Sequence, residues 1–252
     1  MKVLDPDLLL RAYAVGVFPM SDSRDAREVY WVEPRRRAII PLDRFHVSRS
    51  LRKKLRSDHF EVTCDRAFER VLRQCAGRED TWINAEIEAS YIRLHQDGHA
   101  HSIEVHERGE LVGGLYGVRL GGAFFGESMF SLRPDASKIA LAWLVARLVV
   151  GGFRLLDCQF MTDHLRSLGA VEIDQKAYLQ LLSAAVGSAV GSVVGSAAGA
   201  GADAGGRWGS EAGAGADGVV GEFGALDRLL AARGADSPAP GWVISQLLGQ
   251  TS

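Results

Sequence analysis

The spacing of apolar residues differs between the two ends and the middle of the chain, and each spacing predicts a different kind of element. Residues 5–16 begin with Asp5-Pro6-Asp7 and continue with apolar positions at helical intervals. An Asp N-cap, a proline in the first turn and a glycine at the end predict a helix from Asp5 to Gly16. Further apolar periodicity predicts strands at 38–42 and 60–63 and helices at 46–56, 65–75 and 84–96. Asp65 is the expected N-cap of the helix at 65–75.

The middle of the chain has the pattern of an antiparallel meander. Three strand-like runs, at 101–105, 110–118 and 122–130, are separated by short turn sequences that contain Gly109 and Gly121. An apolar helix capped by Asp135 should follow, and then a strand at 153–159, a short helix at 162–167, a strand at 171–173 and a helix at 174–185. This order predicts an α+β fold: a GNAT-like acyltransferase sheet flanked by helices, with a small N-terminal α/β part. The analogy suggests acyl transfer without establishing it.

Composition divides the chain further. We expect a small N-terminal domain at 1–60 and a catalytic domain at 61–183. Residues 184–221 consist mostly of Gly, Ala, Ser and Val, and they hold too few large side chains to offset the entropy of ordering, so we expect a flexible linker or insertion. Residues 222–252 regain apolar periodicity and form a C-terminal segment.

The overall composition is that of an ordinary globular protein. Of the 252 residues, 47% are hydrophobic, and the formal net charge is −2. There is no apolar stretch long enough to cross a membrane, no signal-peptide pattern and no cysteine or histidine spacing typical of a zinc site. We therefore expect a cytoplasmic, monomeric protein with no membrane partner and no bound metal.

A strong local charge contrasts with this balance. Residues 35–56 contain nine basic residues and one acid, a local net charge of +8. A solvated charged face is the usual meaning of such a run. So lopsided a density favours phosphate binding. The candidates are Arg35, Arg36, Arg37, Arg49, Arg52, Lys53 and Arg56.

Polar side chains at two strand ends are candidates for chemistry. Alternation along a strand puts Glu127 and Met129 on one face with Ser128 opposed, and it puts Asp157 and Gln159 together on another strand. In an acyltransferase of this strand order the two strands are neighbours that splay apart, so Glu127, Asp157 and Gln159 could converge. The alternatives are a structural ion pair of Glu127 with an arginine, turn capping by Asp157 and a packed amide for Gln159. Cys158 points the other way and is read as core.

Eight stretches, taken in order, resemble the leucyl/phenylalanyl-tRNA–protein transferase family, and the resemblance runs from about residue 8 to 182. The stretches are Leu10–Pro19, His46–Leu51, Thr81–Ile83, Gly98–Val105, Gly113–Val118, Phe125–Ser131, Ala136–Lys138, and Leu156–Gln159 followed by Leu168–Ala170. The resemblance implies transfer of Leu or Phe from aminoacyl-tRNA to proteins that begin with Arg or Lys, which marks them for degradation. It implies no cofactor, and the loop 131–135 indeed lacks the glycine-rich cradle that an acyl-CoA pyrophosphate would need.

The resemblance also implies roles for individual residues. Glu127, Asp157 and Gln159 correspond to the family's catalytic acids and amide, the basic run would bind tRNA, and the substrate pocket would be formed by Trp82, Met129, Leu144, Leu148 and Met20. Met20 departs from the family, which often has a tryptophan after Phe-Pro. On this reading Gln159, held and polarised by Asp157, contacts the attacking amine, while Glu127 attracts the acceptor's Arg or Lys. An alternative makes Asp157 alone the general base.

Two other classes of function remain possible from the residues. An acetyl-CoA N-acetyltransferase would share the strand order, and a non-catalytic RNA-binding module would use the basic helix without needing the three polar residues.

Overall fold

The computed structural model describes residues 3–57, 59–187, 221–234 and 237–250. Most of the predicted Gly/Ala/Ser linker, residues 188–220, lies outside these ranges. In the described part of the chain, no helix is long and apolar enough to cross a membrane.

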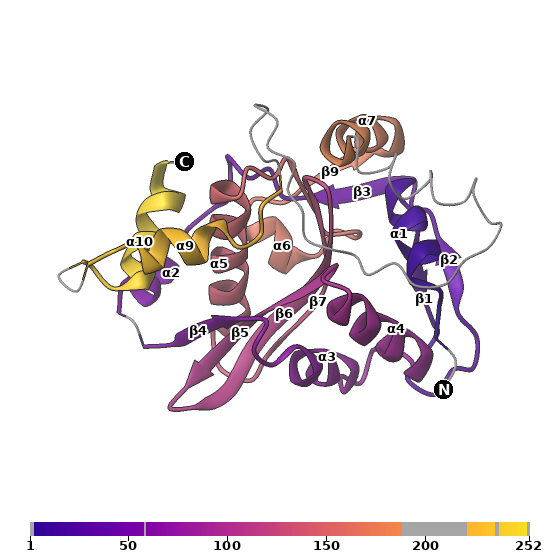
Figure 1. The fold of residues 1–252 in the computed structure, drawn as a ribbon, viewed down its shortest axis with the longest axis horizontal. Helices are drawn as coiled ribbons and strands as arrows, with labels where there is room; N and C mark the ends of the chain where they lie inside the picture. The colour runs from indigo at the N-terminus through magenta and orange to yellow at the C-terminus, as the bar shows by residue number, and fades with distance from the viewer. Residues whose placement is uncertain (1–2, 58, 188–220, 235–236, 251–252) are drawn as a thin grey trace, which may run out of the picture.

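One large mixed sheet forms the centre of the molecule (Figure 1). Its strands lie in the order β4-β5-β6-β7-β8-β3-β9, and every neighbouring pair is antiparallel except β7 and β8. The seven strands are β3 (Arg36–Ile39), β4 (Glu61–Cys64), β5 (Ala100–Glu107), β6 (Glu110–Leu120), β7 (Ala123–Ser131), β8 (Leu155–Asp157) and β9 (Val171–Asp174). The strand β3 thus carries the N-terminal part of the chain into the same sheet as the predicted meander, which is β5-β6-β7.

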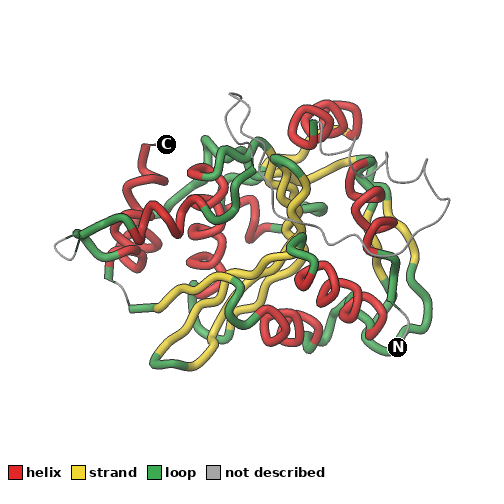
Figure 2. The backbone as a smooth tube through the Cα atoms, in the orientation of Figure 1, coloured by secondary structure: helices red, strands yellow, loops and turns green. Residues whose placement is uncertain are grey.

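Helices cover both faces of the sheet (Figures 1 and 2). One core contains side chains from α2 (Arg49–Arg56), α5 (Ala136–Val150), α6 (Asp163–Ser167), α9 (Ala225–Ala231) and α10 (Pro240–Leu247), which a 3-10 turn, Leu248–Gln250, follows. The other contains side chains from α1 (Pro6–Ala14), α3 (Phe68–Ala76), α4 (Ala85–Gln96) and α7 (Gln175–Val186). Beside this second core, β1 (Phe18–Met20) and β2 (Tyr30–Val32) form a separate two-stranded ribbon. The observed class is a mixed α/β fold with a large sheet between two layers of helices.

Capping side chains explain where several of the helices begin. Each of them accepts a hydrogen bond from a backbone N–H in the first turn, and they are Asp5, Ser48, Asn84, Thr162 and Asp174. The predicted cap Asp65 is wrong, because α3 begins at Phe68 after Ala67, and the Asp65 carboxylate accepts from the backbone N–H of Ser102 at 2.8 Å. Asp135 is the N-cap residue of α5, as predicted, but its φ is 68° and its side chain binds Lys138 at 2.9 Å instead of a backbone N–H of the helix.

The parallel strands β7 and β8 stay paired over only a short distance. Their register runs from Ala123 opposite Leu155 to Phe125 opposite Asp157. Beyond this point β7 continues to Ser131, while the chain after β8 is hydrogen-bonded to β3, with the backbone N–H of Ala38 donating to the carbonyl oxygen of Gln159 at 3.1 Å. The two strands therefore diverge, and the space between them is the site described next.

Candidate active site

A cavity of about 400 Å³ occupies the gap where β7 and β8 diverge. It is lined by residues that belong to both cores, so it extends from one face of the sheet to the other. On the α5 face the walls are aliphatic, and they include Leu115, Met129, Leu141, Leu144 and Leu165. On the opposite face they are largely aromatic, and they include Phe18, Met20, Trp82 and Tyr116.

A β-bulge directs Glu127 into this gap. The register of β6 with β7 pairs Gly117 with Gly126 and Tyr116 with Ser128, so Glu127 is the extra residue. A Cβ at Gly117 would lie 2.2 Å from the carbonyl oxygen of Phe125, which means that this close approach of the strands requires glycine. The prediction that Glu127 and Met129 share a face is wrong, because the bulge shifts the alternation by one residue. Met129 packs in the α5 core, while Glu127 contacts side chains of the other core.

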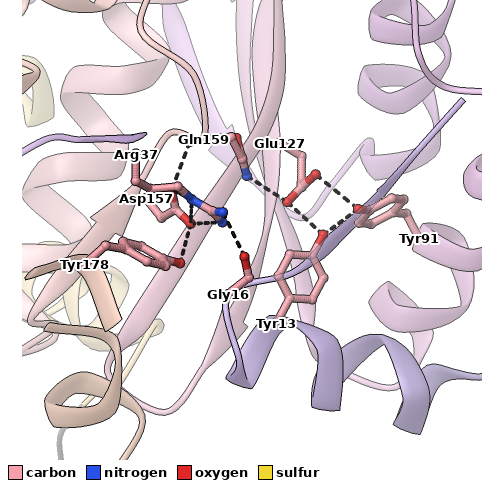
Figure 3. Close-up of polar contacts among 8 residues, drawn as sticks. All are labelled: Tyr13, Gly16, Arg37, Tyr91, Glu127, Asp157, Gln159 and Tyr178. Atoms are coloured by element: carbon pink, nitrogen blue, oxygen red, sulfur yellow. Dashed lines mark hydrogen bonds and ion pairs between the residues drawn. The ribbon is translucent and has the colours of Figure 1, made fainter. Parts of the chain in front are cut away.

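Glu127 is held by two tyrosines in a nearly closed environment. Its side chain is 8% exposed, and it accepts hydrogen bonds from the hydroxyls of Tyr13 at 2.8 Å and Tyr91 at 3.0 Å (Figure 3). Burial raises the pKa of Glu127 to about 7, although the two tyrosine hydrogen bonds act in the opposite direction. Burial also raises the pKa of both phenols, so the tyrosines remain protonated donors.

Gln159 connects the two carboxylates. Its side-chain nitrogen Nε2 donates to Glu127 Oε1 at 3.1 Å, and its backbone N–H donates to Asp157 Oδ1 at 2.8 Å (Figure 3). The residue has a φ of 56°, in the left-handed region, which turns its side chain from the end of β8 toward β7. The structure therefore brings the three predicted residues together, with the side-chain amide held by Glu127 and only the backbone of Gln159 held by Asp157.

Asp157 lies behind the cavity rather than on its wall. It is 0% exposed and absent from the cavity lining. Its carboxylate accepts two hydrogen bonds from Arg37 Nε, at 2.9 and 3.1 Å, one from Arg37 Nη2 at 2.6 Å and one from the Tyr178 hydroxyl at 2.8 Å. These bonds leave Asp157 poorly placed to act alone as the general base.

Arg37 corrects the predicted tRNA-binding group. Its side chain is 1% exposed, lies between the rings of Phe18 and Tyr178, and donates to the carbonyl oxygen of Gly16 at 2.8 Å. Burial opposes its charge, but the ion pair with Asp157 outweighs this, and the net effect raises the pKa of Arg37. Because neighbouring residues of β3 alternate between faces, Arg36 is exposed beside it and pairs with Glu172 at 2.6 Å. Arg35 is also exposed.

The remaining basic candidates form a surface on α2. Arg49, Arg52, Lys53 and Arg56 line a shallow hollow along this helix, and Leu51 and Leu55 on its other side are buried in the α5 core. Lys54 turns toward the start of α5, where it contacts Asp135 at 3.1 Å. The helix is therefore anchored by its apolar side and presents its basic side outward.

Most of the predicted pocket residues are at the cavity, and one is not. Trp82, Met20, Met129 and Leu144 line it, but Leu148 is fully buried one turn further along α5 and does not reach the cavity. Several residues that line the cavity or donate to its carboxylates were not predicted from the sequence, namely Leu141, Leu165, Phe18, Phe160, Arg78, His164, Tyr13, Tyr91 and Tyr178. Tyr13 lies in the family-like stretch Leu10–Pro19, but nothing in its spacing indicates contact with Glu127, 114 positions away.

Other chemistry at this site has little support in the residues present. Cys158 lines the cavity, but burial raises the pKa of its thiol, which disfavours the reactive thiolate. Among the described residues, no group of three or more His, Cys, Asp or Glu side chains could hold a metal ion. The turn before α5, residues 131–135, contains no glycine and so lacks the backbone cradle that an acyl-CoA pyrophosphate would need.

Comparison with known proteins gives consistent matches to one family. The family model for leucyl/phenylalanyl-tRNA protein transferase matches residues 39–183, and that for its N-terminal domain matches residues 3–35. Curated relatives named leucyl/phenylalanyl-tRNA–protein transferase include one from Rhizorhabdus wittichii, 59% identical over 100% of both chains. Others are from Novosphingobium aromaticivorans, 54% identical over 99% of this chain and 97% of the relative, and from Zymomonas mobilis, 62% identical over 74% and 71%.

Among solved structures, L-PGS from Bacillus licheniformis is 16% identical, with a TM-score of 0.35 over 62% of this chain and 53% of its own, a likeness too weak to assign the fold. The two family models, by contrast, match residues 3–35 and 39–183, and the first two relatives are 54–59% identical over 99–100% of this chain. The chain therefore belongs to the leucyl/phenylalanyl-tRNA–protein transferase family.

Proposed function

We propose that the cavity between β7 and β8 is where this chain transfers Leu or Phe from aminoacyl-tRNA to the N-terminal Arg or Lys of acceptor proteins. One observation carries the proposal: Gln159 is held against Glu127 at the point where an aliphatic and an aromatic half of the same cavity meet. An aminoacyl-adenosine has matching halves, an apolar side chain and a flat base, joined at the reactive ester.

The two halves suggest how the donor lies. The Leu or Phe side chain fits against the apolar side chains of Met129, Leu141 and Leu144. The adenine base then lies on the side of Trp82 and Met20, since an indole ring offers a stacking surface to any base. The ester carbonyl falls between them, beside Gln159.

Glu127 gives this site its preference for a cationic acceptor. A buried carboxylate favours the positive charge of an N-terminal Arg or Lys and of its α-ammonium group. An acidic N-terminus would place a second negative charge beside Glu127, and an apolar N-terminal side chain would offer that carboxylate no cation. Both kinds of acceptor should therefore bind poorly.

The reaction itself requires little beyond positioning, because the ester is already activated. The acceptor's α-ammonium group, with a pKa of about 7.7–8.0, loses a proton to Glu127. The neutral amine then attacks the carbonyl carbon, so that the C–N bond forms and the ester C–O bond breaks. The amine's second proton passes to the leaving 3′ oxygen of the tRNA. The side-chain oxygen of Gln159 accepts a hydrogen bond from the amine, and Asp157 is a positioning residue that holds the backbone of Gln159.

The strand arrangement supports a relation to GNAT acyltransferases as a further part of this proposal. An antiparallel meander followed by a helix and a parallel strand that diverges from the meander is the arrangement expected of that fold. This relation would place the ester at the same gap between strands.

The proposal is tested by incubating the protein with radiolabelled leucyl- or phenylalanyl-tRNA and peptides that begin with Arg, Lys, Asp or Ala. Label should appear on the first two peptides only. Transfer to all four, or to none, would contradict the proposed role of the site. Omitting the protein measures spontaneous aminolysis.

A further inference from the structure

Arg78 stands at the aromatic side of the cavity and has no part in the reaction described above. It follows α3, its side chain is exposed, and it lines the cavity together with Trp82 and Ser128. Nη2 donates to Ser128 Oγ at 3.1 Å, and Nη1 contacts the carbonyl oxygen of Met129 at 3.4 Å. These contacts hold the guanidinium beside β7, at the two residues that follow the bulge at Glu127.

The charge of Arg78 is not neutralised by the protein. Its hydrogen-bond partners are a hydroxyl and backbone carbonyls, and no carboxylate of the described residues forms an ion pair with it. Two buried arginines, in contrast, each form an ion pair with a carboxylate: Arg37 with Asp157 and Arg147 with Asp227. Among the cavity-lining residues, Arg78 is the only arginine or lysine. A guanidinium has five N–H donors, and three of them are used by Ser128 and by the carbonyl oxygens of Met129 and Cys75, so two remain for a ligand.

The donor substrate carries an anion at a fixed distance from its ester. The aminoacyl group is esterified to the ribose of the terminal adenosine, and the 5′ oxygen of that ribose leads to the first phosphodiester. If the base lies on the Trp82 side, this phosphodiester leaves the cavity on the same side, where Arg78 is located. Resting on the proposed function, we infer that Arg78 binds the phosphodiester next to the terminal adenosine and so fixes the depth of the ester in the cavity.

Three donors of increasing length separate this role from a structural one. The first is phenylalanyl-adenosine, which has no phosphate; the second is phenylalanyl-cytidylyl-adenosine, which has one phosphodiester; the third is phenylalanyl-tRNA. Transfer to a peptide with N-terminal Arg is measured as kcat/KM for the wild type and Arg78→Gln. Loss of a charge-assisted hydrogen bond should lower kcat/KM roughly 10- to 100-fold for the second and third donors. The value for the first should change less than about twofold, since it offers no phosphate to bind.

Two further variants sharpen the comparison. Arg78→Lys keeps the positive charge without the planar fork and should recover part of the loss. Arg73→Gln removes an exposed arginine of α3 that pairs with Glu69, five residues before Arg78. This variant should leave kcat/KM unchanged for all three donors. With the tRNA donor, the plot of log(kcat/KM) against log salt should become shallower by about 0.7 in Arg78→Gln, the value of one phosphate contact to a single strand.

The outcomes are distinguishable. An equal loss with all three donors would mean that Arg78 only supports the bulge through Ser128 and Met129, and it would overturn the inference. No loss with any donor would overturn it as well. If the wild type transfers from none of the donors, the proposed function itself fails.

Discussion

The pKa of Glu127 is close to that of the acceptor's α-amino group, which it would deprotonate. Burial raises its pKa to about 7, within about a unit of an α-amino group at about 7.7–8.0. A proton can therefore pass between the two at little cost near neutral pH. The hydroxyls of Tyr13 and Tyr91 lower this pKa, since they donate to the ionised form. Without them the carboxylate would stay protonated at higher pH, and it would neither attract a cation nor accept a proton.

The first prediction concerns the effect of the tyrosine hydrogen bonds on the pKa of Glu127. Ionised Glu127 is the active form, so kcat/KM should rise with pH through about 7. Tyr91→Phe removes one donor to the carboxylate and should shift this rise to higher pH, by about one pH unit for a hydrogen bond of about 1.4 kcal/mol. The measurement is a pH profile of kcat/KM with peptide limiting. Tyr116→Phe is the matched control, because the Tyr116 hydroxyl has no hydrogen-bond partner among the described residues. A shift to lower pH in Tyr91→Phe would contradict the assignment.

The second prediction concerns Gln159 and Asp157. Gln159→Ala removes the group that contacts the amine and should lower kcat by roughly 100-fold. Asp157→Asn should lower kcat as well, because it weakens the hold on the Gln159 backbone. Equilibrium binding of aminoacyl-tRNA should be nearly unchanged in both. Gln180→Ala, at an exposed position of α7, is the control. Wild-type transfer rates in both variants would remove these residues from the mechanism.

At the scale of elements, the helix α2 has a buried apolar side and an exposed basic side. Ser48 caps it, Leu51 and Leu55 anchor it, and the opposite side presents Arg49, Arg52 and Lys53 without a carboxylate partner among the described residues. Such a ridge binds a phosphate backbone by releasing counterions, which makes the affinity steeply dependent on salt.

The third prediction follows from this ridge. A triple variant, Arg49→Gln, Arg52→Gln and Lys53→Gln, should weaken tRNA binding and reduce the slope of log affinity against log salt by about 2–3. A triple replacement of Arg93, Arg108 and Arg166 by Gln removes the same charge elsewhere and should have a much smaller effect. Filter binding over a salt series measures both. Equal slopes for the two triple variants would refute a specific role of α2.

Element types were largely predictable from the sequence, and the exceptions have physical causes. Helices predicted from a capping residue and a periodic apolar face were confirmed; α4, for example, begins directly after its cap Asn84. The bulge at Glu127 was missed because alternation assumes an unbroken ladder. Arg37 was misplaced because the predicted strand began at Ala38, and a run of three arginines does not reveal which member points inward. Asp65 was misread as a cap, and Asp135 caps α5 without a side-chain bond to the helix, because their carboxylates bind the Ser102 N–H and Lys138 instead.

The buried pair of Arg37 and Asp157 joins distant segments at the scale of the whole molecule. Arg37 reaches the carbonyl of Gly16 after α1, and Asp157 accepts from Tyr178 on α7, so the ends of β3 and β8 are tied to two helices. Insertion of β3 between β8 and β9 depends on such long-range contacts, which local patterns do not encode. The sequence therefore predicted the order of the later strands, the convergence of the polar residues and a strand near β3, but not the position of β3 between β8 and β9.

The fourth prediction tests this pair by its effect on stability. Arg37→Met leaves the buried carboxylate of Asp157 without its cation and should lower the free energy of unfolding by about 3–5 kcal/mol. Adding Asp157→Asn removes the stranded charge, so the double variant should be more stable than Arg37→Met alone. Urea unfolding of the wild type, both single variants and the double variant gives the coupling energy. Strict additivity would show that the pair does not act as a unit.

The protonated state of the Cys158 thiol has a consequence for steady-state kinetics. Burial disfavours the thiolate of Cys158, the one cysteine that lines the cavity, and the direct attack proposed above needs no acyl-enzyme. With both substrates bound at once, double-reciprocal plots at several peptide concentrations should intersect instead of running parallel. Parallel lines would reveal an acyl-enzyme intermediate, and quenching the enzyme before peptide is added would trap it on the protein.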